Sequence, residues 1–490
     1  MNRKLVITIL YSIFFIYIIF CFYGYPLLLG DTECFLPAAF QIRLHKQLIN
    51  PFYNAGFIEG NKFLFYPPFY PFFMSFLIIK AKAIYAYISL TIVNLFTLFV
   101  VNLIVQHLIK ENSINKASLT IDKCFLVFFF LAICAFIAPG NSRPEVLCYL
   151  ILSLTVYLFL KSIKYRYFFI GVLGSLSVLT SPVFGIYLTL LILLFIAYNS
   201  PNSNKVFISI FSGAFSILII FFIFYPYPVT EIVKTMKVHS SNVIFNRNES
   251  YSFSSFLRYY ILSSNGAFVG LIFAVALIIV VKRIFRNNKS DKKKYLIAIL
   301  LMLLLALIVY FSFRNFAMYY NLTVLAPLML IIIFHEYITE TSKVVKLFLL
   351  STVILASIAF LRLTLNFGLT FLSSEFNIHS VDKRLVKYAN MQGRTIGVSS
   401  SFWIFFSGPV LCKPVIYPGI YNSASPKKFD YIILQQVGTG IYSPPNLEGY
   451  DLIENYFENK ELRVFGIKTA SYSPFYQYAT YKKHEKNSFF

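Results

Sequence analysis

Carboxylates stand beside the apolar runs of this sequence at two places where a hydroxyl could be deprotonated. Asp31 and Glu33, in the sequence G-D-T-E, come directly after the first long apolar run. Glu145 follows Arg143 in the sequence R-P-E, in a short turn between two later runs. A carboxylate at the mouth of an apolar helix needs water, a partner or a ligand, because burying its charge is costly. We expect one of these groups to act as a general base, with a solvated loop charge as the alternative for Asp31 and Glu33.

Basic side chains accompany these carboxylates in loops that the topology argued below places on one side of a membrane. Carboxylates and cations at one face suit a reaction that deprotonates a hydroxyl while it stabilises a departing phosphate. For any single cation, contact with a lipid headgroup or a structural ion pair is the alternative. The candidates in these loops are Arg43, Lys62, His239, Arg247, Arg258 and Arg314.

Other kinds of catalytic site have no support in the sequence. It contains no Walker A loop, no G-x-G-x-x-G, no G-x-S-x-G and no cysteine and histidine cluster with metal-binding spacing. His335 and Glu336 lack the second histidine of a zinc protease helix, so we do not expect a site there.

The composition indicates that the chain is a membrane protein and that these loops connect its membrane-spanning helices. Of the 490 residues, 58% are hydrophobic and 13% are charged, and the mean hydropathy is +0.70. Ordinary soluble domains are roughly 45–50% apolar and about 25% charged, so a soluble globule is excluded. Apolar runs of about 15 to 25 residues predict an all-α polytopic membrane protein. The net charge is +23, and much of the excess of Lys and Arg lies in short loops between the apolar runs. Basic loops are typical of the cytoplasmic side of a membrane protein, so we do not interpret this charge as a nucleic-acid-binding surface.

The apolar runs predict about eleven transmembrane helices. The first run follows Arg3 and Lys4 and is too long for a signal peptide, so we expect an uncleaved anchor with a cytoplasmic N-terminus. An odd number of spans places the C-terminus outside, and the loops assigned to the inside are all basic. The predicted spans are Leu5–Tyr23, Ile84–Ile109, Cys124–Ala138, Val146–Leu160, Tyr167–Leu179, Val183–Ala197, Val206–Phe224, Tyr260–Val281, Tyr295–Phe311, Leu322–Phe334 and Val344–Leu365.

Two segments are predicted to fold on the outer side. In the loop 24–83, a proline-rich sequence at 67–71 breaks the apolar stretch Phe63–Ile79, which we interpret as an interfacial or re-entrant helix. The segment 370–490 is more polar and is predicted to form a small extracytoplasmic α/β domain. Its expected elements are a helix at Val381–Met391 and strands at Thr395–Val398, Pro414–Tyr417, Tyr431–Gln435 and Leu462–Ile467.

The order of these motifs resembles the GT-C superfamily of polyprenyl-phosphate-sugar-dependent glycosyltransferases. G-D-T-E at 30–33 is followed by Y-P-P-F-Y-P at 66–71, and R-P-E at 143–145 matches the second acidic position of one branch. That branch holds the protein O-mannosyltransferases and the bacterial enzymes that add aminoarabinose to lipid A. Further motifs similar to those of this branch are the G-x-x-G-S-L-x-x-L-T-S-P stretch at 171–182, His239 with the later Arg258-Tyr259-Tyr260, and residues 314–327.

The resemblance implies a GT-C-like catalytic domain at 1–369 and a role for each candidate residue. Asp31 would be the base that activates the acceptor hydroxyl, while Glu33 and Glu145 would support it, position the acceptor or hold a divalent cation. The sequence departs from the family at Thr32, which separates the two carboxylates, and at Ser181, where many members have a lysine that meets the donor phosphate. The residues that would bind substrate or replace that lysine are Arg43, Lys62, Tyr66, Arg143, His239, Arg247, Arg258 and Arg314.

The function implied by the resemblance is transfer of a monosaccharide from a polyprenyl-phosphate donor, with inversion, on the periplasmic face of a bacterial inner membrane. The acceptor would be a cell-envelope polysaccharide such as lipopolysaccharide, a glycolipid or a protein. A lipid-linked sugar transporter or flippase is the alternative from another class, and it predicts charged residues along a path through the spans. An O-antigen-type polymerase is a third interpretation.

Overall fold

The structure is a computed structural model whose described residues cover most of the chain in separate stretches. They are 3–23, 32–50, 62–64, 66–79, 83–111, 119–137, 143–161, 163–182, 184–186, 188–189, 203–235, 270–272, 274–279, 281–282, 329–330, 333–334, 336–337, 340, 342–372, 378–398, 402, 405, 412–414, 429–435, 444, 446–456, 461–464, 467–471 and 477–484.

The chain divides into two compact units, and each is described by itself. The first unit comprises Met1–Phe15, Asn94–Gly140 and Glu145–Leu361. The second comprises Ile16–Val93, Asn141–Pro144 and Arg362–Phe490. Three long helices contribute residues to both units: α1 (Arg3–Phe22), α4 (Ala83–Glu111) and α16 (Lys343–Leu372).

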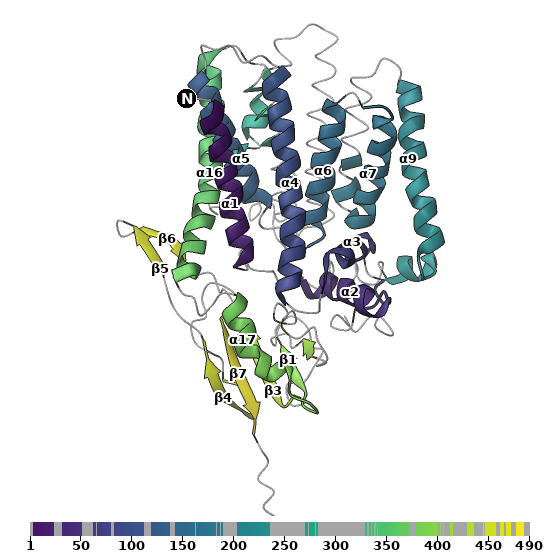
Figure 1. Ribbon diagram of the computed structural model, residues 1–490, viewed down its shortest axis with the longest axis vertical. Coiled ribbons are helices and arrows are strands. Elements are labelled where there is room, and N and C mark those ends of the chain that lie inside the picture. The colour runs from purple at the N-terminus through teal and green to yellow at the C-terminus, as the bar shows by residue number, and fades with distance from the viewer. Residues whose placement is uncertain are drawn as a thin grey trace, which may run out of the picture. The chain divides into compact units, whose positions relative to one another are not determined.

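The first unit is built from apolar helices. Besides parts of the three shared helices, it contains α5 (Leu119–Ile137), α6 (Glu145–Leu160), α7 (Arg166–Thr180) and α9 (Ser203–Phe224), of which α6, α7 and α9 stand side by side (Figure 1). Helices α7 and α9 approach closely at two glycines. A Cβ added at Gly171 would overlap the backbone of Ile210, and one added at Gly213 would overlap the backbone of Phe168. Glycine at these positions therefore permits backbone contact between the two helices.

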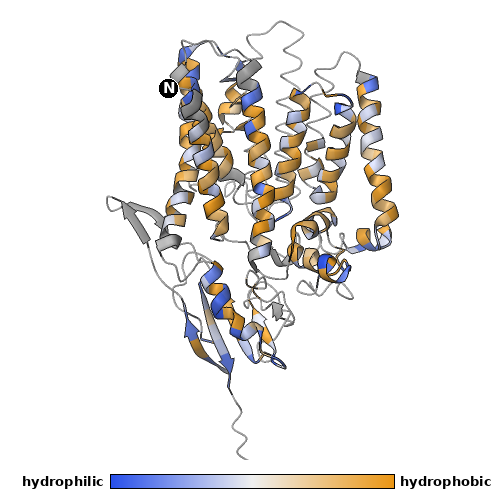
Figure 2. Ribbon diagram, in the orientation of Figure 1, coloured by the Kyte–Doolittle hydropathy of each residue, from blue (hydrophilic) through white to orange (hydrophobic). Residues whose placement is uncertain are grey.

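Three of the described helices are long and apolar enough to cross a membrane. They contain the segments Ile88–His107, Asn204–Phe224 and Lys343–Leu365, and Figure 2 shows hydrophobic residues along most of α4, α9 and α16. The apolar helices indicate a membrane protein by their length and composition.

The described residues do not support eleven spans. Seven predicted spans coincide with helices α1, α4, α5, α6, α7, α9 and α16. Several of these helices are short: the 15 residues of α7 rise about 22 Å, against about 30 Å of hydrocarbon in a bilayer. Four other predicted spans, Val183–Ala197, Tyr260–Val281, Tyr295–Phe311 and Leu322–Phe334, lie wholly or partly outside the described residues.

The second unit contains the helix predicted within the stretch Phe63–Ile79, and this helix begins inside the proline-rich sequence. Helix α2 (Thr32–His45) is followed by α3 (Phe69–Leu77), whose 9 residues span only about 13 Å. Residues Tyr70, Met74 and Ser75 of α3 are buried, whereas Phe72 and Phe76 are exposed. An apolar exposed face on so short a helix is typical of a segment that lies at a membrane surface.

The C-terminal part of the second unit combines one helix with a five-stranded sheet. Helix α17 (Ile378–Ala389) buries Ile378, Val381, Leu385 and Tyr388, which lie on one face of a helix. The predicted helix at Val381–Met391 is therefore confirmed, although it begins three residues earlier. The sheet has the order β2-β1-β3-β7-β4, from strands β1 (Ile396–Val398), β2 (Cys412–Pro414), β3 (Tyr431–Gln435), β4 (Tyr450–Asn455) and β7 (Tyr478–Lys483).

The pairing in this sheet is mixed. Strand β1 is parallel to β2 and β3, and β7 is antiparallel to β3 and β4. A separate antiparallel hairpin is formed by β5 (Glu461–Val464) and β6 (Ile467–Ser471), where the sequence predicted a single strand over Leu462–Ile467. The predicted strand at Pro414–Tyr417 overlaps β2 only at Pro414. A buried cluster on strands β3, β4 and β7, together with the preceding Phe429, consists of Phe429, Ile432, Leu434, Tyr450, Ala479 and Tyr481.

Candidate functional site

Glu145 is the predicted carboxylate whose environment the structure describes. It is the first residue of α6, and its side chain is fully buried. The hydroxyl of Ser181, also fully buried, donates to Glu145 Oε1 at 3.3 Å. A carboxylate in the first turn of a helix interacts favourably with the positive end of the helix dipole. Helix α6 and the residue that ends α7 therefore hold a carboxylate at the end of two apolar helices.

The end of α7 places the Ser181 hydroxyl beside Glu145. Its backbone turns to an extended conformation after the last helical residue, Thr180. The buried hydroxyls of Ser177 and Thr180 donate to carbonyls of their own helix, those of Gly174 and Leu176. The Ser181 hydroxyl instead points across to α6. Ser181, which the sequence analysis singled out beside the candidate carboxylates, is thus a direct hydrogen-bond partner of Glu145.

The basic candidates of the first loop gather where α2 ends. Arg43 lies in the last turn of α2 and is exposed. Lys46 then adopts a left-handed backbone with φ 58°, which ends the helix. Ile49 pairs with Lys62 in an antiparallel bridge, so the exposed Lys62 lies on the segment that pairs with the chain leaving α2. These two cations are therefore accessible to an anionic group.

Tyr66 packs beside α2. Its ring meets the ring of Phe35 edge-on at 5.0 Å between centroids, and Tyr70 of α3 contacts the same Phe35 at 6.2 Å. Arg143 is buried, with 8% of its surface exposed. Like Arg43, Lys62 and Tyr66, it belongs to the second unit, whereas Glu145 and Ser181 belong to the first.

The remaining predicted site residues lie outside the part of the chain that the structure describes. Glu33 is the second residue of α2, but its side chain is not among the described ones. Asp31, His239, Arg247, Arg258 and Arg314 lie in undescribed stretches, and their predicted roles remain predictions.

A second polar cluster, which we did not predict from the sequence, lies in the first unit. Tyr337 donates from its hydroxyl to Asp122 Oδ1 at 2.8 Å, and Lys346 Nζ lies 3.3 Å from the same oxygen. The Tyr337 ring stacks on Phe125 with 3.6 Å between centroids. Asp122 is 4% exposed, so this contact ties the first turns of α5 and α16 together through a buried charge.

Lys282 forms the other half of this cluster. Its ammonium group pairs with Glu340 and lies 3.6 Å from Glu336 Oε1. The backbone N–H of Ser342, just before α16, donates to Glu340 Oε1 at 3.0 Å. The sequence signals for the cluster were present: Asp122 stands at the start of an apolar helix, and Glu336 and Glu340 have the spacing of one helical turn.

A metal site is not visible among the described side chains, where no group of three or more His, Cys, Asp or Glu residues is placed to hold an ion. The side chains of Asp31 and Glu33 are outside that set.

Comparison with known proteins leaves the family open. No protein-family model matches the chain, and neither a curated protein nor a solved structure is significantly similar to it.

Proposed function

We propose that this protein is a membrane glycosyltransferase of the GT-C type that uses a polyprenyl-phosphate-linked monosaccharide. The observation that carries the proposal is the buried Glu145 at the start of α6, hydrogen-bonded to Ser181. An ionisable group placed in this way among apolar helices is a functional candidate by default. It stands at the position that the motif order assigns to the second acidic residue of the family.

The proposed reaction is a direct displacement. The acceptor hydroxyl oxygen forms a bond to the anomeric carbon, and the bond from that carbon to the phosphate oxygen breaks, with inversion. Asp31 takes the hydroxyl proton, and the polyprenyl phosphate departs with the bonding electrons. Arg43, in the last turn of α2, and Lys62, on the segment that pairs with Ile49, are both exposed and are suited to receive the phosphate charge.

Helix α3 supports the placement of this chemistry at a membrane surface. The apolar side chains of Phe72, Phe76 and Ile79 are 49%, 66% and 61% exposed, and the first two rings meet edge-on. Such a face is expected to contact lipid, which would bring a lipid-linked donor to the neighbouring first loop. The proposed location is the periplasmic face of a bacterial inner membrane, with a cytoplasmic N-terminus and the α17 domain outside.

The experiment uses the full chain in nanodiscs with a panel of short-chain polyprenyl-phosphate sugars and a cell-envelope extract as acceptor. We expect polyprenyl phosphate to be released from one donor by the wild type and the release to be lost in Asp31→Asn. Glu145→Gln should lower it strongly, and the exposed Glu448→Gln serves as the matched control. Intact donors across the panel would contradict the proposal, and full activity of Asp31→Asn would transfer the base role to Glu33 or Glu145.

A lipid-linked sugar transporter is the second candidate, and one observation favours it. Asp122, Lys123, Glu336 and Glu340 are between 2% and 9% exposed, and such buried charges are typical of transport paths. Movement of an intact donor between the two leaflets of a liposome, without release of polyprenyl phosphate, would support this function instead.

A further inference from the structure

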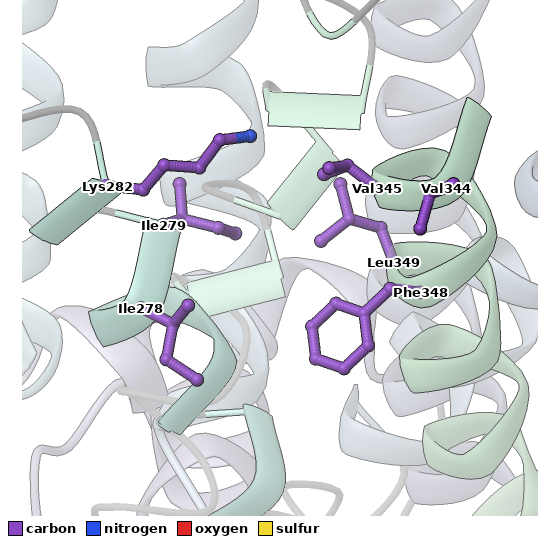
Figure 3. Close-up of a pocket in the computed structure, with 7 residues that line it drawn as sticks. All are labelled: Ile278, Ile279, Lys282, Val344, Val345, Phe348 and Leu349. Atoms are coloured by element: carbon purple, nitrogen blue, oxygen red, sulfur yellow. The ribbon is translucent and has the colours of Figure 1, made fainter. Parts of the chain in front are cut away.

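An apolar groove lies on the first unit between two helical segments. One wall is formed by Ile278, Ile279 and Lys282, and the other by residues of the first two turns of α16 (Figure 3). The volume is about 300 Å³. The residues on the α16 wall are Val344, Val345, Phe348 and Leu349.

The groove opens to the outside of the helical unit. Val344 is 76% exposed, Ile278 is 55% exposed and Phe348 is 49% exposed, although all three are apolar. In a membrane protein, an apolar surface of this kind at a helix side is covered by the hydrocarbon chains of lipids. The occupant that the lining fits is therefore an acyl chain.

Lys343 supplies a positive charge at one end of the groove, whereas the charge of Lys282 is neutralised by two carboxylates. Lys282 stands at the end of the lining shown in Figure 3, with 27% of its side chain exposed, and it is held by Glu336 and Glu340. Lys343 opens α16 beside the lining residue Val344 and is exposed. No ion pair of Lys343 with another described residue occurs, so its charge is available to an anion.

We propose that this groove is a binding site for an anionic phospholipid, with one acyl chain between Ile278 and Phe348 and the phosphate beside Lys343. The lipid would be supplied by the surrounding bilayer. Lysines gather at this end of the helices, which the charge pattern of the loops predicts to be cytoplasmic, and that leaflet is the one that attracts basic segments through its anionic lipids. The site is independent of the proposed glycosyltransferase chemistry, which concerns other residues.

The experiment measures lipid retained by the purified full chain in detergent, by native mass spectrometry. The probes are phosphatidylglycerol and phosphatidylcholine with identical chains, added at equal concentration. We expect phosphatidylglycerol to bind preferentially, and inorganic phosphate at millimolar concentration to leave that binding unchanged. Equal binding of the two lipids would overturn the proposal. Loss of lipid in the presence of phosphate would show that the lysines bind a free anion and not a lipid, which would also overturn the proposal.

Three variants locate the site. Lys343→Gln should weaken phosphatidylglycerol binding about fivefold, the effect expected for one lysine near a lipid phosphate, and leave phosphatidylcholine unchanged. Ile278→Trp should fill the groove and abolish the preferential binding. Ile220→Trp is the matched control, because Ile220 of α9 is similarly exposed, at 51%, and does not line the groove. Wild-type binding by Ile278→Trp would show that lipid attaches elsewhere.

Discussion

At the scale of single residues, the contact between Glu145 and Ser181 is the most informative feature. Both side chains are fully buried, and the hydroxyl donates to the carboxylate at 3.3 Å. A lysine at position 181 would place a second charge here, whereas serine supplies a neutral donor. The contact therefore holds the buried carboxylate without adding a positive charge beside it.

Replacing Ser181 by alanine should reduce both stability and donor turnover. The change leaves a buried carboxylate with one donor fewer, which typically costs about 1–3 kcal/mol. The measurement is the thermal unfolding midpoint of the full chain in detergent, together with release of polyprenyl phosphate. Ser216→Ala is the control, because the exposed Ser216 hydroxyl bonds only to the Ser212 carbonyl of its own helix among the contacts described. Equal effects of both changes would show that the contact has no special role.

Asp430 predicts a pH dependence in the C-terminal part of the chain. The backbone N–H of Thr395 donates to its carboxylate at 2.7 Å, and the Thr395 hydroxyl and nearby Arg394 add to this, which holds the pKa of Asp430 below its usual value. Because the folded pKa is depressed, the stabilisation is present above the unfolded pKa of about 3.9 and is lost as pH falls through the folded value.

The unfolding midpoints of wild type and Asp430→Asn should therefore differ at pH 6 and converge toward pH 3. The control is Glu448→Gln, because Glu448 is exposed. Its unfolding midpoint should stay close to that of the wild type at both pH values. A difference between wild type and Asp430→Asn that is constant with pH would contradict the assignment.

At the scale of elements, the contact between α7 and α9 depends on residues without side chains. Backbone atoms of Ile210 and Phe168 occupy the space that a Cβ would need at Gly171 and Gly213. Because α7 ends at the residue before Ser181, any shift of this helix would also move the partner of Glu145.

Gly171→Ala should destabilise the protein by about 1–3 kcal/mol, the usual cost of overpacking, and lower activity as well. Gly368→Ala is the matched control, since an added Cβ there meets nothing within 4 Å and alanine favours a helix by about 1 kcal/mol over glycine. The unfolding midpoint should fall for Gly171→Ala and rise for Gly368→Ala. An unchanged midpoint for Gly171→Ala would show that the close contact between α7 and α9 does not contribute to stability.

The sequence predicted the elements better than their contacts. Hydropathy located α1, α4, α5, α6, α7, α9 and α16, because each helix contains one apolar run, although α5 begins five residues earlier and α16 ends seven residues later than predicted. Strands β4 and β7 were missed because neither has a period of two: β4 exposes three consecutive residues, and β7 buries four. The motif R-P-E identified Glu145 as a candidate, but its partner Ser181 lies 36 residues away in the sequence. Likewise, Tyr337 lies 215 residues from its partner Asp122. The periodicity of a sequence carries no information on such long-range pairs.

At the scale of the whole molecule, two polar assemblies of the first unit lie at different points along its helices. The Asp122 cluster joins the first turns of α5 and α16. The remaining length of α5 and the residues that follow it separate Asp122 from Glu145 along the chain. One assembly thus ties distant segments together, while the other is a candidate for chemistry.

Asp122→Ala should destabilise the protein by about 3–5 kcal/mol, because it leaves Lys346 and the Tyr337 hydroxyl without their buried partner. The double change Asp122→Leu with Lys346→Met should restore most of the loss. Lys387→Met provides the contrast, since Lys387 is 54% exposed and its pair with Glu454 is worth at most about 1 kcal/mol. Unfolding in detergent measures all three, and failure of the double variant to recover would contradict the ion-pair account.

The edge strand β4 has a consequence for handling the protein. Among the described strands it pairs only with β7, and it exposes Leu452 and Ile453. A register shift between Leu452 and Glu454 interrupts the ladder, and the exposed carboxylate of Asp451 adds negative charge. An irregular, charged border of this kind discourages strands of separate molecules from joining. Deleting Ile453 to regularise β4 would therefore be expected to promote fibrillar self-association of the purified protein.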